Sequence, residues 1–200
     1  MKEILMSIRP QWCEKIFNGS KTIEVRKSRP SIPTPFKVYV YQTKHNGGKA
    51  IVSEVLNSVY GGGKVIGSFV CDRVRLCIPF GLKGHLLSQE VYREMCLTKE
   101  QLDKYGGLKT LYGWHITEPK LFEKPRELGE FYTKCDKKGD ETCGDCLYLR
   151  VMLNSYPCDD SVDTWCGVDN KKPISRPPQS WCYVEAYRDD GGDHDTHYGI

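Results

Sequence analysis

The most informative stretch of this sequence is GSKTIEVR, residues 19–26. The segment before it, residues 10–17, begins with proline and has helically spaced apolar residues, so we expect an amphipathic helix that stops at Asn18-Gly19. Residues 22–26 alternate like a strand, which places Glu24 and Arg26 on one face. Together with Lys21 they can bind an anion or the polar edge of a base. The simpler interpretation is a solvated strand face with an ion pair between positions i and i+2.

Strands and short helices are expected on both sides of this stretch. Apolar or β-branched runs predict strands over 3–8, 36–43, 64–78, 110–122 and 181–187, the third of them bent near Asp72. Residues 49–60 are either a hairpin arm or an excursion. Ser88 and Thr98 are expected to cap helices that run to about Met95 and Tyr105. We therefore expect a mixed α+β domain, a small β-barrel with a few short helices.

Composition and charge limit the classes of protein. The 200 residues are 39% hydrophobic, 28% charged and 11% aromatic, as in a folded globular domain. No apolar run is long enough to span a membrane, and the N-terminal run is too short for a secretory signal, so we expect a cytoplasmic protein. The formal net charge is only +3, but residues 1–30 carry seven bases against three acids. That end is a candidate anion-binding surface, whereas residues 135–170 carry three bases against eight acids.

The motif at residues 19–26 also carries a family resemblance. Gly19, Lys21, Glu24 and Arg26 reproduce the G-x-K-x-x-E-x-R signature of the ASCH family, whose members resemble PUA domains. The segment LMSIRP at 5–10, the helix over 12–17 and the strands over 64–71, 111–116 and 181–187 also fit that family. The resemblance covers most of the chain outside its cysteine-rich segment. It implies a PUA-like barrel with a cleft beside the first helix, lined by the signature, and a role in RNA or nucleoside recognition.

The resemblance leaves an enzymatic alternative. Some members have ribonuclease activity, and one branch hydrolyses N4-acylated cytidines with a lysine that activates a threonine two positions before the signature arginine. This sequence has Glu24 at that position, and Thr22 is offset, which argues against a covalent route. As candidate catalytic residues, Glu24 would activate water while Lys21 stabilises an oxyanion. The more economical role for Glu24 is to accept a hydrogen bond from a base amino group.

The sequence-based hypothesis is thus binding of RNA or a modified nucleoside, with a hydrolase or a protein-interaction adaptor as alternatives. Bases would stack on tryptophans, although a tryptophan at the position of Trp12 in the first helix is more often a core residue. The loop before Trp181 offers hydrogen-bonding edges. We expect His115, for which no catalytic partner is evident, to be structural. The predicted ligand contacts are Arg9, Trp12, Lys21, Glu24, Arg26, Arg29, Gln179, Ser180 and Trp181.

The ten cysteines form two groups. Those scattered among apolar residues are expected to be buried thiols: Cys13, Cys71, Cys77, Cys96 and Cys182. The others fall within 32 positions and include the C-x2-C spacing of a zinc knuckle. We predict a structural zinc held by Cys135, Cys143, Cys146 and Cys166, with Cys158 as the alternative fourth ligand; a loop with free thiols or one disulfide is the competing interpretation. The predicted organisation is a barrel (1–132 and 176–188), a cysteine-rich insertion (133–175) and a flexible tail (189–200).

Overall fold

The structure is a computed structural model that describes residues 2–44, 62–79, 81, 87–134 and 171–185. The segment 49–60, the clustered cysteines and the tail over 189–200 lie outside the described residues. The three-part organisation predicted from the sequence therefore stays a prediction.

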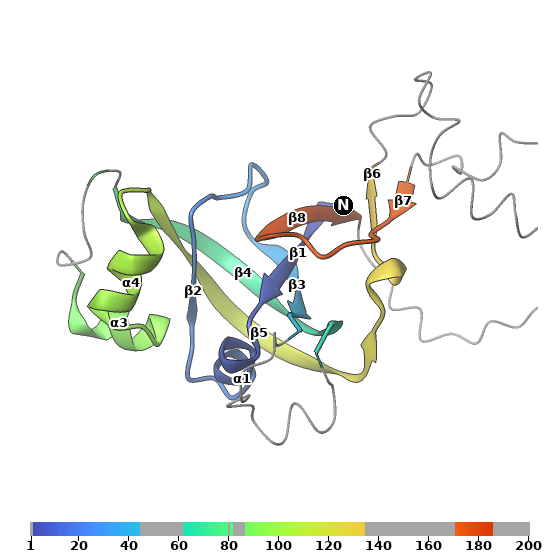
Figure 1. Ribbon diagram of the computed structural model, residues 1–200, viewed down its shortest axis with the longest axis horizontal. Coiled ribbons are helices and arrows are strands. Elements are labelled where there is room, and N and C mark those ends of the chain that lie inside the picture. Colours follow the sequence, from blue (N-terminus) through green and yellow to red (C-terminus); the bar gives the residue numbers. More distant parts are fainter. Residues whose placement is uncertain (1, 45–61, 80, 82–86, 135–170, 186–200) are drawn as a thin grey trace, which may run out of the picture.

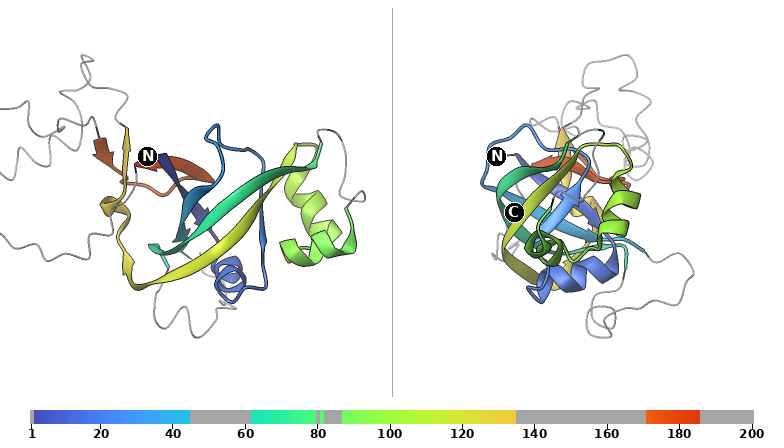
Figure 2. Two further views of the ribbon diagram at one scale, coloured as in Figure 1. Left: turned by 180° about the vertical axis from the view of Figure 1, so that it is seen from behind. Right: turned by 90° about the vertical axis from the view of Figure 1, so that its left-hand side faces the viewer.

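A six-stranded mixed sheet forms the body of the molecule (Figure 1). Its order is β2-β5-β4-β3-β1-β8, in which β1 and β3 are parallel and the other neighbours antiparallel. The strands are β1 (Lys2–Ile8), β2 (Ile23–Arg26), β3 (Phe36–Gln42), β4 (Lys64–Ile78), β5 (Leu111–Arg126) and β8 (Trp181–Glu185). A separate pair, β6 (Tyr132–Lys134) and β7 (Lys171–Pro173), lies at the end of the molecule opposite α3 and α4 (Figures 1 and 2).

Three helices occur where their sequence signals predict them: α1 (Pro10–Phe17), α3 (Gln89–Met95) and α4 (Lys99–Gly106). A short 3-10 turn, η2 (Leu128–Glu130), was not predicted. Thr98 caps α4 in a capping box with Gln101, whereas the Ser88 side chain makes no capping hydrogen bond to α3. Gly19 has a φ of 81°, so it supplies the left-handed turn that follows α1. No helix among the described residues is long and apolar enough to cross a membrane.

The expected class, a mixed sheet with a few short helices, is confirmed. The described strands do not close into a barrel, however, because β2 and β8 remain as the two edges of the sheet. Register shifts along β4 and β5, including one between Cys71 and Val74, bend this long pair where a bend near Asp72 was predicted. The sheet curls, but its edges meet through side chains rather than through a backbone ladder.

Three apolar clusters hold the elements together. The first lies between the sheet and α1 and includes Ile4, Ile16 and Trp114; we call the sheet face that it covers the inner face. The second packs around Tyr39 and Phe131. The third packs α3 and α4 against the ends of the strands through Met95, Leu102 and their neighbours. Of the thiols expected to be buried, Cys13 and Cys71 are inaccessible to solvent, whereas Cys77, Cys96 and Cys182 are half-buried.

Candidate functional site

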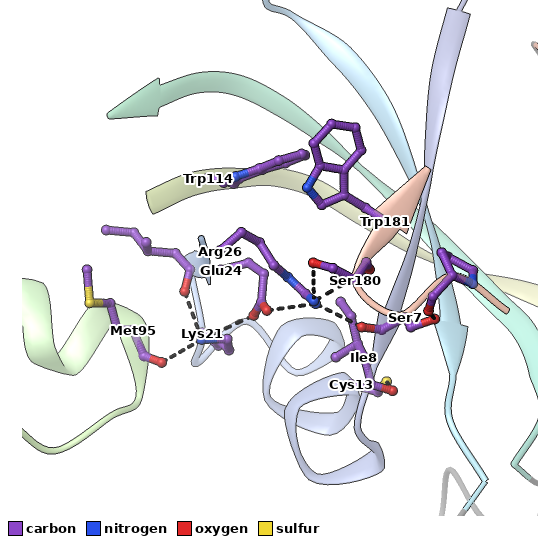
Figure 3. Close-up of polar contacts among 12 residues, drawn as sticks. Ser7, Ile8, Cys13, Lys21, Glu24, Arg26, Met95, Trp114, Ser180 and Trp181 are labelled. Atoms are coloured by element: carbon purple, nitrogen blue, oxygen red, sulfur yellow. Dashed lines mark hydrogen bonds and ion pairs between the residues drawn. The ribbon is translucent and has the colours of Figure 1, made fainter. Parts of the chain in front are cut away.

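The signature residues Lys21, Glu24 and Arg26 form a buried chain of ion pairs (Figure 3). One carboxylate oxygen of Glu24 lies 3.4 Å from Lys21 Nζ, and the other lies 3.0 Å from Arg26 Nη2. The exposed fractions are 2% for Lys21 and 7% for both Glu24 and Arg26. The predicted shared face of Glu24 and Arg26 is confirmed, but the simpler interpretation of a solvated face is wrong. The motif supplies a buried network, which we call the signature network.

Lys21 ties β2 to the end of α3. Its Nζ donates to the carbonyl oxygens of Ile23 (2.8 Å) and Met95 (2.6 Å), besides its contact with Glu24. Burial lowers the pKa of Lys21, and the Glu24 charge opposes that shift. Since three acceptors surround the ammonium, the geometry suits a charged, fixed donor rather than a general base. The Cys96 thiol, which donates to the Ser20 carbonyl oxygen, strengthens the same junction.

Arg26 spans the gap between the two edges of the sheet (Figure 3). From β2, its Nη2 donates to the Ser7 carbonyl oxygen in β1 at 2.9 Å, and its Nη1 donates to Ser180 Oγ at 3.3 Å, just before β8. Ser7 Oγ in turn donates to the Pro178 carbonyl oxygen. The Nε atom of Arg26 is buried and has no hydrogen-bond partner within the described part of the chain. Arg26 therefore joins by side-chain contacts the edges that no backbone ladder connects.

Two tryptophans lie above Arg26 in Figure 3. The rings of Trp114 and Trp181 are 5.5 Å apart, and both indoles donate to Ser28: Trp114 to its carbonyl oxygen and Trp181 to its hydroxyl. Trp181 is half-buried and packs against the cluster of the inner face. These contacts give Trp181 a role in holding the loop after β2, whatever it does toward a ligand.

A groove of about 810 Å³ lies beside α1, against α3 and α4. Its charged lining residues are Lys15, Arg93 and Lys99, and none of its described lining residues is acidic. Trp12 and Tyr92 are its aromatic residues. Lys15 Nζ and Lys21 Nζ each lie 5.3 Å from the centre of the Trp12 ring, so this indole separates the groove from the signature network. The ASCH resemblance implied a cleft beside the first helix that is lined by the signature. The groove has that position, but Lys21, Glu24 and Arg26 do not line it, because they are buried in the signature network.

Charges near the groove are mixed on the side of α4. Burial, together with the charges of Asp103 and Glu100, raises the pKa of Tyr92. The positive charge of the groove is therefore most effective around Trp12 and Lys15 on α1.

The predicted ligand contacts divide into three sets. Lys21, Glu24, Arg26 and Ser180 meet in the signature network, Trp12 connects it with the groove, and Trp181 packs beside Arg26. The remaining three, Arg9, Arg29 and Gln179, are exposed. Arg29 also lines a separate hollow of about 510 Å³ over residues 29–33.

Three lining residues of the groove were not predicted: Tyr92, Arg93 and Lys99. Their helices were predicted, but no local signal in the sequence indicated that α3 and α4 would lie beside α1. The partner of His115 was not predicted either: its Nδ1 lies 2.6 Å from Asp72 Oδ1 across β4 and β5.

The predicted zinc ligands Cys135, Cys143, Cys146 and Cys166 lie outside the described residues. Among the residues that are described, no three histidine, cysteine or acidic side chains gather as a metal site would require. The zinc site stays a prediction.

Comparison with solved structures finds ASCH proteins. The crystal structure of ASCH from Zymomonas mobilis has a TM-score of 0.51 and 16% identity, over 92% of this chain and 87% of that chain. A single-residue variant of the Zymomonas mobilis protein has a TM-score of 0.50 and 16% identity, over 92% and 91% of the two chains. No protein-family model matches the sequence, and no curated protein matches it. At such low identity the likeness concerns the fold alone, and the fold of this chain is similar to that of the Zymomonas mobilis ASCH protein, as its signature predicted.

Proposed function

We propose that this protein binds RNA or a modified nucleoside in the groove beside α1. The observation that carries the proposal is the position of Trp12, a half-buried side chain that lines a basic groove and has two lysine ammonium groups 5.3 Å from the centre of its ring. Cations beside an aromatic ring that lines a groove are the features with which proteins hold unpaired bases and their phosphates. A volume of about 810 Å³ is in the usual range of small-ligand sites.

Each class of lining residue has a role in this proposal. A base stacks on Trp12 or Tyr92, and phosphate oxygens approach Lys15, Arg93 and Lys99. Two lining glutamines, Gln89 and Gln101, offer hydrogen-bonding groups for a base edge; Gln101 already accepts from the Thr98 backbone amide. The signature network supports the wall behind Trp12.

The geometry favours binding over hydrolysis of an acylated cytidine. Lys21 donates to three acceptors, and the Glu24 carboxylate is shared between two cations. A base that activates water needs an available lone pair that reaches the substrate. Neither side chain lines the groove.

The test is titration of a fluorescein-labelled ten-nucleotide single-stranded RNA, followed by anisotropy. The parent is compared with a groove variant, Lys15→Ala/Arg93→Ala/Lys99→Ala, and with a control of equal charge change at the other end of the molecule, Lys124→Ala/Lys134→Ala/Lys172→Ala. We expect the groove variant to bind at least tenfold more weakly. The steepness of the plot of log K against log salt concentration should fall by about 2. Each phosphate contact of a single strand contributes roughly 0.7 to that slope, and the variant removes three cations.

A second comparison isolates the aromatic ring. Trp12→Phe should retain most of the affinity and Trp12→Leu should lose it, because only the former keeps a π-face. Equal affinities of the groove variant and the far-end control would contradict the proposal. Release of cytidine from N4-acetylcytidine by the parent would favour the hydrolase instead.

A further inference from the structure

The ends of β2, β4, β5 and α4 converge at one end of the molecule, seen at the upper left of Figure 1. The residues that meet there come from distant parts of the chain. Lys27 and Arg29 follow β2, Leu76 is near the end of β4, Tyr105 is in the last turn of α4, and Tyr112 is near the start of β5. We call these five residues the strand-end surface.

Strand register places part of this surface on the inner face of the sheet. Tyr112 pairs with Arg26 of β2 on one side and with Leu76 of β4 on the other. Directly paired residues on neighbouring strands share a face, so the three side chains form one row across the sheet. The row begins in the signature network at Arg26 and ends at Leu76, which is 57% exposed. An apolar side chain of that exposure is available to a partner.

Two cation–aromatic pairs flank the row. Lys27 Nζ lies 4.7 Å from the centre of the Tyr105 ring, and Arg29 Cζ lies 6.0 Å from the centre of the Tyr112 ring. Both cations are exposed, and the exposed fraction of Tyr105 is 39%. The exposed ring of Tyr105 and the half-buried ring of Tyr112, each paired with a cation, match the chemistry of an RNA single strand, which presents flat bases and a negative backbone.

The helix α4 connects this surface with the groove. Lys99 and Gln101, near its N-terminal end, line the groove, whereas Tyr105 belongs to the strand-end surface. Eight helical residues extend about 12 Å, so the two sites are separated by only a short length of chain.

We propose that the strand-end surface binds a single-stranded RNA segment that continues from the nucleotide held in the groove. This inference rests on the proposed function. Unpaired bases are required because the tyrosine rings stack only on bases that are not enclosed in a duplex.

The experiment compares a long ligand with a short one on the same variants. The ligands are the labelled ten-nucleotide RNA, read by anisotropy, and cytidine 5′-monophosphate, read by calorimetry. The surface variant is Lys27→Ala/Arg29→Ala, and the matched control is Lys124→Ala/Lys134→Ala. We expect the surface variant to bind the long RNA at least fivefold more weakly and the mononucleotide with parental affinity, because only the long RNA extends beyond the groove. Tyr105→Leu should weaken binding of the long RNA, and Tyr105→Phe should retain it.

The outcomes separate this inference from the proposed function. If the parent binds neither ligand, the proposed function fails and the inference fails with it. If the parent binds both ligands, and the surface variant equals the control on the long RNA, the inference alone is overturned. If the surface variant leaves RNA binding unchanged but alters self-association in sedimentation, the strand-end surface is a protein interface. That result also overturns the inference. Circular dichroism of each variant excludes misfolding as the cause.

Discussion

At position 24 a carboxylate stands between two cations, and folding removes all three from water. Taking a charged group out of water costs several kcal/mol, and one opposite charge rarely repays that cost. Here Glu24 compensates Lys21 and Arg26, while the carbonyl oxygens of Met95 and Ser7 accept further hydrogen bonds from the two cations. The network is therefore stable as a unit and sensitive to the loss of one member.

Glu24→Gln tests this dependence. The amide keeps the shape of the side chain but leaves the Lys21 and Arg26 charges buried without a counter-charge, so we expect a loss of about 3–5 kcal/mol in the free energy of unfolding. Urea denaturation at pH 7 measures it. The matched control is Glu127→Gln at the exposed pair with Lys64, for which we expect less than about 1 kcal/mol. Equal effects of the two substitutions would show that burial does not govern the network.

At the scale of elements, the packing of α1 against the sheet depends on one position in β4. A Cβ atom at Gly67 would lie 2.4 Å from the Lys120 carbonyl oxygen in β5 and 2.8 Å from the Phe17 ring of α1. Only a glycine lets the helix approach the sheet this closely. Since α1 carries Trp12 and Lys15, the same contact positions one wall of the groove.

Gly67→Ala should therefore destabilise the fold and weaken RNA binding together. We expect a loss of about 1–3 kcal/mol in the free energy of unfolding, the usual cost of overpacking, because Phe17 and a backbone carbonyl must both move. Gly129→Ala is the control, since a Cβ there meets nothing within 4 Å, and surface changes of this kind usually stay within about 0.5 kcal/mol. Thermal denaturation and anisotropy give the two readings. If the Gly67→Ala protein is as stable as the parent, the close packing of α1 against the sheet does not require glycine at this position.

At the scale of the whole molecule, buried thiols determine how stability responds to alkaline pH. Burial raises the pKa of Cys71 to about 12 and that of Cys182 to about 11, from an ordinary value of 9.0, and it also raises the pKa of Cys13. The unfolded chain ionises these thiols first, so unfolding releases protons and the free energy of unfolding falls as pH rises above 9. Lys21 acts in the opposite sense. Because its pKa is lowered, folded Lys21 loses its proton at a lower pH than the unfolded chain does, and this raises the free energy of unfolding as pH rises toward 10.5.

We expect the thiols to outweigh the single lysine. Urea denaturation at pH 8 and pH 10 should show a lower free energy of unfolding at pH 10. The variant Cys13→Ala/Cys71→Ala should lose less between the two values, because each fully protected thiol contributes up to about 1.4 kcal/mol per pH unit above 9. Cavities left by the substitutions lower stability at both pH values and leave the difference unaffected. The same pH response in parent and variant would contradict this assignment.

The cysteine-rich segment supplies the last prediction, which rests on spacing alone. We expect the purified protein to contain about one zinc per chain and the variant Cys143→Ser/Cys146→Ser to contain none. The reason is that both thiolates of a C-x2-C pair bind the same tetrahedral ion. Emission spectroscopy of metal content is the measurement, and Cys71→Ser in β4 is the control. Loss with Cys166→Ser but not with Cys158→Ser would identify the fourth ligand. A parent without zinc would leave free thiols or a disulfide.

The sequence alone determined the strands of the main sheet, the three α-helices of the described residues and the expected fold. Proline, glycine and a capping box delimit α1 and α4, and β-branched alternation delimits the strands, because these signals act between neighbours in the chain. The four-residue signature, together with the helix and strands that fit the same family, predicted the ASCH fold, which the solved structures support.

Only the tertiary structure decided what the signature residues do. Alternation predicts which side chains share a face but not whether that face is covered, so the same residues could have formed a solvated strand or an open cleft. The partners that bury them lie far along the chain: Met95 is 74 residues from Lys21, and Ser180 is 154 residues from Arg26. Contacts at such separations arise from the strand order β2-β5-β4-β3-β1-β8 and from the packing of α3 on β2, which no local pattern encodes.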